Sequence, residues 1–88
     1  MKDDSCIFCK IAAGDIPSSK IYEDDDVIAF KDIHPQAPVH FLIVPKKHIV
    51  SLAETQSADE PLLGKMLGLV RKLAKEQGCD NGFRVIIN

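Results

Sequence analysis

The amphipathic stretch over residues 58–77 constrains the fold more than any other part of the chain. Its apolar residues recur at the spacing of one face of an α-helix, and its lysines fall on the other side. Ser57 stands in a capping-box pattern with Glu60 and is one candidate for the N-terminal cap of this helix. Asp59 is the other candidate, because Pro61 is tolerated only in the first turn of a helix. Gly78 ends it. A helix with one broad apolar face needs another layer of secondary structure to cover that face.

Short β-type segments supply that layer. Residues 21–22 and 27–30 flank an acidic turn and predict an antiparallel hairpin with a solvated tip. Residues 39–44 are apolar at nearly every position and stop before Pro45, which is typical of a central strand. Residues 83–87 predict a further strand after the long helix.

The N-terminal part predicts a short helix over residues 6–13, capped by Ser5 or Asp4 and ended by Gly14. The expected fold class is therefore α+β, with an antiparallel sheet, a short N-terminal helix and one long helix. Residues 1–88 form a single domain, since repeats and linkers are absent from the sequence. A strand at the end of the chain leaves an apolar sheet edge, so we expect a domain that is C-terminally incomplete.

Composition narrows the class of protein. Hydrophobic residues make up 45% and charged residues 27%, which excludes disordered, collagen-like and coiled-coil chains. The net charge of −2 gives no basic excess for binding nucleic acid. Apolar runs are far shorter than the ~20 residues of a membrane span. Without a signal-peptide pattern at the N-terminus, a cytoplasmic location is expected.

Two of the three cysteines form a Cys-x-x-Cys motif at Cys6 and Cys9. The odd number of cysteines suits a reducing compartment. The motif has three interpretations: half of a zinc site, a redox pair, or two core residues. A redox pair is expected where a strand opens a long helix, whereas the residues before Cys6 are polar. Zinc needs two further ligands, and three histidines are available.

His40 interrupts the apolar run over residues 39–44. From the residues alone, a single histidine in an apolar strand is more often a core residue than a functional one. P-loop, G-x-S-x-G and H-E-x-x-H motifs are absent from the sequence. Composition and periodicity therefore lead only to a small α+β domain.

A set of motifs is more specific than composition and periodicity. It resembles the histidine triad (HIT) family, in its branch of purine-nucleotide phosphoramidases. The motifs are CIFCKI at residues 6–11, IP at 16–17, AFKDIHPQAP at 29–38, HFLIVPKKH at 40–48 and GFRVIIN at 82–88. The resemblance implies a HIT-like fold. It also implies a nucleotide-binding hydrolase or transferase that cleaves nucleoside 5′-phosphoramidates or related nucleotide phosphate esters through a nucleotidyl-histidine.

The family's His-x-His-x-His-x-x motif, which holds the nucleophile, would follow Asn88 and is not in this sequence. We therefore expect the chain to be truncated before the last strand and inactive alone. His40 matches only the auxiliary histidine beside the triad. The alternative is a non-catalytic nucleoside-binding or dimerisation module.

The resemblance also implies a nucleotide site. An apolar slot holds the purine base, and an acid at the position of Asp32 accepts both ribose hydroxyls, as an acceptor-only carboxylate can. Without the resemblance, the apolar positions are plain core residues and Asp32 is a turn-forming acid. The residues that match this site are Phe8, Ile11, Ile16, Phe30, Lys31, Asp32, Ile33 and Asn88.

Two further expectations follow from the resemblance. Family members with this Cys-x-x-Cys often hold zinc through both cysteines, a histidine at the position of His48 and the first triad histidine. We therefore expect a structural zinc in the complete protein, with Cys6, Cys9 and His48 among its ligands. Family members also form homodimers through the long helix and the following strand. Gly64 and Gly68 are either neutral surface positions or points where a partner backbone comes close.

Overall fold

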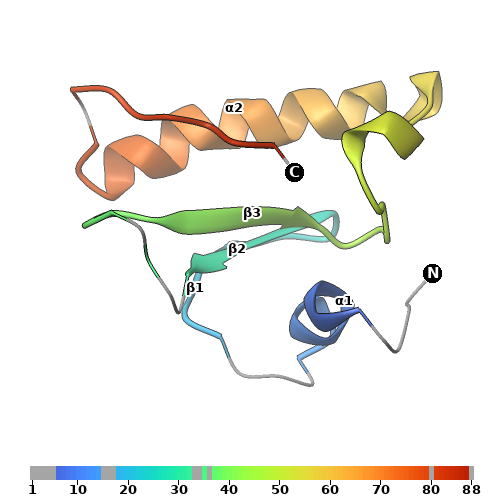
Figure 1. Ribbon diagram of the computed structural model, residues 1–88, viewed down its shortest axis with the longest axis horizontal. Helices are drawn as coiled ribbons and strands as arrows, with labels where there is room; N and C mark the ends of the chain where they lie inside the picture. The colour runs from blue at the N-terminus through green and yellow to red at the C-terminus, as the bar shows by residue number, and fades with distance from the viewer. Residues whose placement is uncertain (1–5, 15–17, 33–34, 36, 80, 88) are drawn as a thin grey trace. The chain divides into compact units, whose positions relative to one another are not determined.

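The computed structural model describes the chain except residues 1–5, 15–17, 33–34, 36, 80 and 88. It divides into two compact units, Met1–His48 and Ile49–Asn88. The first unit holds a helix and a three-stranded sheet, and the second holds the long helix (Figure 1).

The N-terminal helix α1 spans Ile7–Ala12, close to the predicted range. Its cap is Cys6, whose Sγ accepts a hydrogen bond from the backbone N–H of Cys9 at 3.4 Å. The prediction that Ser5 or Asp4 is the cap is therefore wrong. The helix ends before Gly14, where φ is +83° and a side chain would be strained.

The sheet of the first unit is antiparallel, in the order β1 (Lys20–Glu23), β2 (Val27–Lys31) and β3 (Phe41–Pro45). The predicted hairpin is confirmed, since β1 pairs with β2. The prediction that residues 39–44 form the central strand is wrong within the described sheet, because β2 lies between the other two strands.

The core of the first unit lies on β2. Four consecutive residues, Val27 to Phe30, are at most 4% exposed. Because successive side chains on a strand point to opposite faces, β2 is covered on both faces. The residues of β3 are only half-buried, as expected for a strand with one hydrogen-bonded neighbour.

Asp24 organises the turn that leads into β2. Its Oδ1 accepts hydrogen bonds from the backbone N–H groups of Asp26 and Val27, at 2.8 and 2.9 Å. Its Oδ2 accepts from the hydroxyl of Tyr22 at 2.6 Å. Apart from the half-buried Asp24 the acidic turn is exposed, as predicted, and it is held by one of its own carboxylates.

In the second unit, short 3₁₀ turns over Leu52–Glu54 and Ser57–Asp59 precede the helix α2, Glu60–Glu76. Asp59 stands at the cap position, as one of the two predicted alternatives. Its Oδ2 accepts from the backbone N–H of Gln56 at 2.9 Å, so the side chain turns back toward the preceding residues. Gly78, with φ of +84°, follows the helix end as predicted.

Residues 83–87 run back from the turn after α2 without forming a strand (Figure 1). The predicted strand is therefore wrong for this structure. A strand is completed by hydrogen bonds to a neighbour, and the described residues provide no neighbour for this segment. Four apolar side chains are left 46–72% exposed: Phe83, Val85, Ile86 and Ile87.

The helices of the described residues are all too short or too polar to cross a lipid bilayer.

Candidate functional site

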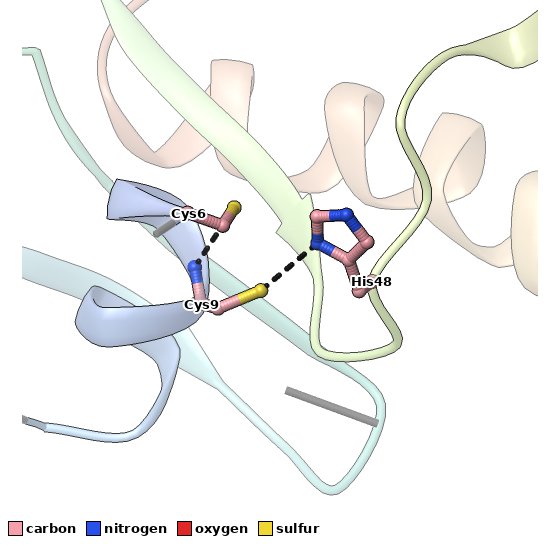
Figure 2. Close-up of side chains that lie close together, drawn as sticks. All are labelled: Cys6, Cys9 and His48. Carbon is pink, nitrogen blue, oxygen red and sulfur yellow. Dashed lines mark hydrogen bonds between the residues drawn. The ribbon is translucent and has the colours of Figure 1, made fainter. Parts of the chain in front are cut away.

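Cys6, Cys9 and His48 lie together in the first unit (Figure 2). Cys6 caps α1 and Cys9 lies in its first turn, so helical spacing places the two sulfurs on one side. His48 follows β3 and is 39 residues from Cys9 in sequence. The ligand atoms of all three residues lie within 4.8 Å of one another.

The contact between Cys9 and His48 closes this Cys/His cluster. The Cys9 Sγ lies 3.1 Å from the His48 Nδ1, and either atom can donate, depending on the tautomer of the ring. Cys9 is buried, whereas Cys6 and His48 are half-buried. The cluster is therefore shielded from water on the Cys9 side and accessible from the other.

The donor set of the Cys/His cluster fits a zinc ion. Zinc prefers thiolate and imidazole ligands, and it binds them at about 2.0–2.3 Å in tetrahedral geometry. Such ligands are separated by about 3.5–4 Å, so atoms that lie within 4.8 Å of one another need only small adjustments. The structure thus brings together the three residues that the family resemblance implied as metal ligands.

Asp32 and His40 form a second polar pair in the first unit. Lys31 and Phe41 form the last pair of the β2–β3 ladder on the loop side; Asp32 follows Lys31, and His40 precedes Phe41. The backbone N–H of Asp32 donates to the carbonyl oxygen of His40 at 3.1 Å. The Nε2 of His40 lies 3.3 Å from the Oδ2 of Asp32, with both side chains half-buried.

The other described residues of the expected nucleotide site lie on α1 and β2. Phe8, which is 43% exposed, and the half-buried Ile11 lie on α1. Phe30 is only 4% exposed and belongs to the core, whereas Lys31 is exposed. The predictions for Ile16, Ile33 and Asn88 lie outside the described residues.

The pairing of Asp32 with His40 was not predicted, because the sequence suggested separate roles for the two residues. The available signal was their placement at the two ends of the loop between the strands, which a β2–β3 hairpin brings opposite each other.

A charged cluster around Glu23 was also missed. Its Oε1 lies 2.9 Å from the Lys20 Nζ, and its Oε2 lies 2.9 Å from the Lys46 Nζ. Hydrogen bonds from these lysines hold the pKa of Glu23 below its ordinary value of 4.5, and the bond from Lys20 has the larger effect. The three residues come from β1 and from the turn after β3, so only the strand pairing could reveal the cluster.

Comparison with known proteins places the chain in a family. Residues 5–87 match the family model described as scavenger mRNA decapping enzyme C-term binding. Protein HitA from Neisseria gonorrhoeae is 51% identical over 85 residues, which are 97% of this chain and 79% of HitA. The 14 kDa zinc-binding protein from Zea mays is 42% identical over 90 residues, covering 100% of this chain and 70% of that protein.

Solved structures agree with this placement. A histidine triad protein from Clostridium difficile has a TM-score of 0.94 at 50% identity, covering 100% of this chain and 77% of that one. A HIT family hydrolase from Legionella pneumophila has a TM-score of 0.89 at 44% identity, covering 94% of this chain and 77% of that one. A histidine triad nucleotide-binding protein from Candida albicans has a TM-score of 0.77 at 38% identity, covering 92% of this chain and 55% of that one.

The chain belongs to the histidine triad (HIT) family. The resemblance noted in the sequence is therefore confirmed, as is the α+β fold with its antiparallel sheet, short helix and long helix.

Proposed function

We propose that this protein is a nucleotide-binding hydrolase or transferase of the HIT type, acting on nucleoside 5′-phosphoramidates or related nucleotide phosphate esters. Two similar structures support this class, since one is described as a HIT family hydrolase and another as a histidine triad nucleotide-binding protein. The reaction class implies a nucleotidyl-histidine intermediate: a histidine nitrogen displaces the amine or alcohol leaving group from phosphorus, and water then cleaves the nitrogen–phosphorus bond and releases the nucleotide.

The observation that carries the proposal is the position of Asp32. Its carboxylate is half-buried at the end of β2, beside His40, where a ligand can reach it while the strand fixes its backbone. A carboxylate accepts hydrogen bonds and cannot donate them, which suits the two adjacent hydroxyls of a ribose. Phe8 on α1 offers an exposed aromatic ring on which a purine base can stack.

The 88-residue chain supplies the binding part of this function. Its histidines, His34, His40 and His48, do not form a His-x-His-x-His sequence. We therefore expect nucleotide binding without turnover from this chain. The triad sequence of a relative can be appended to this chain. If the extended protein still does not hydrolyse a nucleoside 5′-phosphoramidate, the alternative of a non-catalytic nucleoside-binding module is favoured.

Titration of the ¹⁵N-labelled chain with adenosine 5′-monophosphate tests the proposal. We expect shifts of amide signals near Asp32, and we expect Asp32→Asn to weaken binding by about tenfold, as for loss of a charge-assisted hydrogen bond. Asp25→Asn, at an exposed acid in the turn, is the matched control and should leave the affinity unchanged. Binding that survives Asp32→Asn at full strength would contradict the proposed site.

We also propose that Cys6, Cys9 and His48 hold a structural zinc, supported by their mutual proximity and by the zinc-binding relative from Zea mays. Bound there, zinc would cross-link α1 to the turn after β3. Three protein ligands give a weaker site than the closed four-ligand sites of structural zinc, so the affinity should be moderate.

Elemental analysis after loading with zinc and removal of the unbound metal should give close to one zinc per chain, and Cys9→Ser should lower that content strongly. Cys79→Ser is the matched control, because Cys79 is also a free thiol but lies in the other unit, outside the cluster. A zinc content near zero in the unmodified chain would leave the two cysteines as packing and capping residues.

A homodimer is the third part of the proposal. Exposed apolar side chains on α2 and after it, among them Leu67 at 57% and Ile86 at 72% exposure, favour coverage by a second copy. Sedimentation should therefore show a monomer–dimer equilibrium at micromolar concentration. A clean monomer at tens of micromolar would contradict this part.

A further inference from the structure

The loop between β2 and β3 is closed at its base by two contacts between the same two residues. One is the backbone hydrogen bond from Asp32 N–H to the carbonyl oxygen of His40, at 3.1 Å. The other joins the side chains, from His40 Nε2 to Asp32 Oδ2, at 3.3 Å. The two residues lie directly beyond Lys31 and Phe41, the pair that ends the β2–β3 ladder.

This arrangement holds the Asp32 carboxylate against a rigid part of the sheet. The backbones of the two residues are joined by the backbone hydrogen bond directly beyond the last strand pair, and the side chains are 28% and 22% exposed for His40 and Asp32. A side chain that is already oriented loses less freedom when a ligand binds, so preorganisation strengthens binding of the group that it contacts.

We propose that His40 is a positioning residue for Asp32 and thereby sets the selectivity of the site for ribose over 2′-deoxyribose. The inference rests on the proposed function, because it assumes that Asp32 accepts hydrogen bonds from the sugar. A carboxylate offers about four acceptor positions, so His40 and two ribose hydroxyls can share it. A 2′-deoxyribose lacks one of those hydroxyls and gains less from a well-held carboxylate.

This role differs from the one that the family resemblance implied for His40, which is contact with the catalytic histidines. A residue that acts at the catalytic histidines affects the phosphate end of every nucleotide equally. A residue that acts through Asp32 affects ribonucleotides more than deoxyribonucleotides. The sugar of the ligand therefore distinguishes the two roles.

The experiment compares the affinities of the full 88-residue chain for adenosine 5′-monophosphate and for its 2′-deoxy analogue, by NMR titration. His40→Asn places its amide nitrogen near the position of Nδ1 and removes the contact with Asp32. His40→Gln reaches the position of Nε2 and retains it. We expect the ribose preference to fall about fivefold in His40→Asn and to be largely retained in His40→Gln, because the deoxy ligand keeps only one hydroxyl for Asp32 and is weakened less.

A second readout needs no ligand. The ¹⁵N signal of the His40 Nε2 should shift in Asp32→Asn and stay in place in Asp25→Asn, if the Asp32 carboxylate is its partner. This measurement uses folded proteins with an unchanged histidine, so it holds even if a His40 variant fails to fold. An unchanged chemical shift of the His40 Nε2 in Asp32→Asn would overturn the positioning role.

The remaining outcomes are also decisive. Equal weakening of both nucleotides in His40→Asn, or an unchanged ribose preference, would refute the inference while leaving the proposed function intact. If the unmodified chain bound neither nucleotide, the proposed function would fail and the selectivity role of His40 with it.

Discussion

Two short apolar segments of β-type sequence have opposite fates in this protein. Residues 27–30 form the body of β2 and are at most 4% exposed. Residues 83–87 form no strand, and their apolar side chains are 46–72% exposed. Both segments carry β-branched and aromatic residues in a run that predicts a strand.

The difference between the two segments lies in their partners. On β2, Ile28 is paired with Glu23 on one side and with Val44 on the other. Both partner strands are close in sequence, so little loop-closure entropy opposes their pairing. The described residues offer no such strand to residues 83–87. Sequence therefore supplies the tendency to form a strand, and a hydrogen-bonded neighbour decides whether it forms.

The largest expected effect is at the centre of β2. Ile28→Ala should lower the free energy of unfolding by about 3 kcal/mol, because it leaves a cavity at a side chain that is 1% exposed. That is a large part of the stability of a small domain, about 5–15 kcal/mol. Urea denaturation followed by circular dichroism measures it. A change below about 1 kcal/mol would mean that β2 is not the core that its burial indicates.

The turn into β2 gives the next effect. Asp24→Ala removes the acceptor for Tyr22 and for two backbone N–H groups, and should cost about 2 kcal/mol in the same denaturation experiment. Asp25→Ala in the same exposed turn is the control and should stay within about 0.5 kcal/mol. Equal effects of the two variants would argue that the turn is shaped by its backbone alone.

A smaller effect depends on pH. The folded pKa of Glu23 lies below its ordinary value of 4.5, because of hydrogen bonds from Lys20 and then Lys46. Its stabilising contribution is therefore fully present above pH 4.5 and is lost as the pH falls through the lower folded pKa. The effect should be small and should weaken in high salt, since Glu23 is exposed.

Glu23→Gln tests this pH dependence. Below pH 4.5, the melting temperature of the unmodified chain should fall more steeply than that of the variant, and the two curves should converge in acid. Parallel curves over the whole range would show that the two lysines do not stabilise the charged form of Glu23.

The smallest effect is expected in the segment without a partner. In dilute, monomeric protein, Ile86→Ala should change the free energy of unfolding by less than about 0.5 kcal/mol, because Ile86 is 72% exposed. It removes the same atoms as Ile28→Ala, so the pair of variants isolates the effect of burial. A loss comparable to that at Ile28 would remove the contrast between the two segments.

The local elements could be predicted from the sequence because they depend on neighbouring residues. The periodicity before Gly78 predicted a long helix, found as Glu60–Glu76, and the short β-type segments on either side of the acidic turn predicted the β1–β2 hairpin. The Cys-x-x-Cys spacing placed two sulfurs on one side of the first helical turn. The cap of α1 was missed, because a thiol is an uncommon cap and Ser5 was a better candidate by preference.

Only the tertiary structure decided which distant residues meet. β2, rather than residues 39–44, became the central described strand, because it has a hydrogen-bonded neighbour on each side. The same pairing sets Asp32 beside His40, and the fold of the first unit brings His48 to Cys9 from 39 residues away. The sequence by itself determined the helices, the hairpin and the HIT family, whereas these encounters depend on which segments pair across long loops and on the closure of those loops.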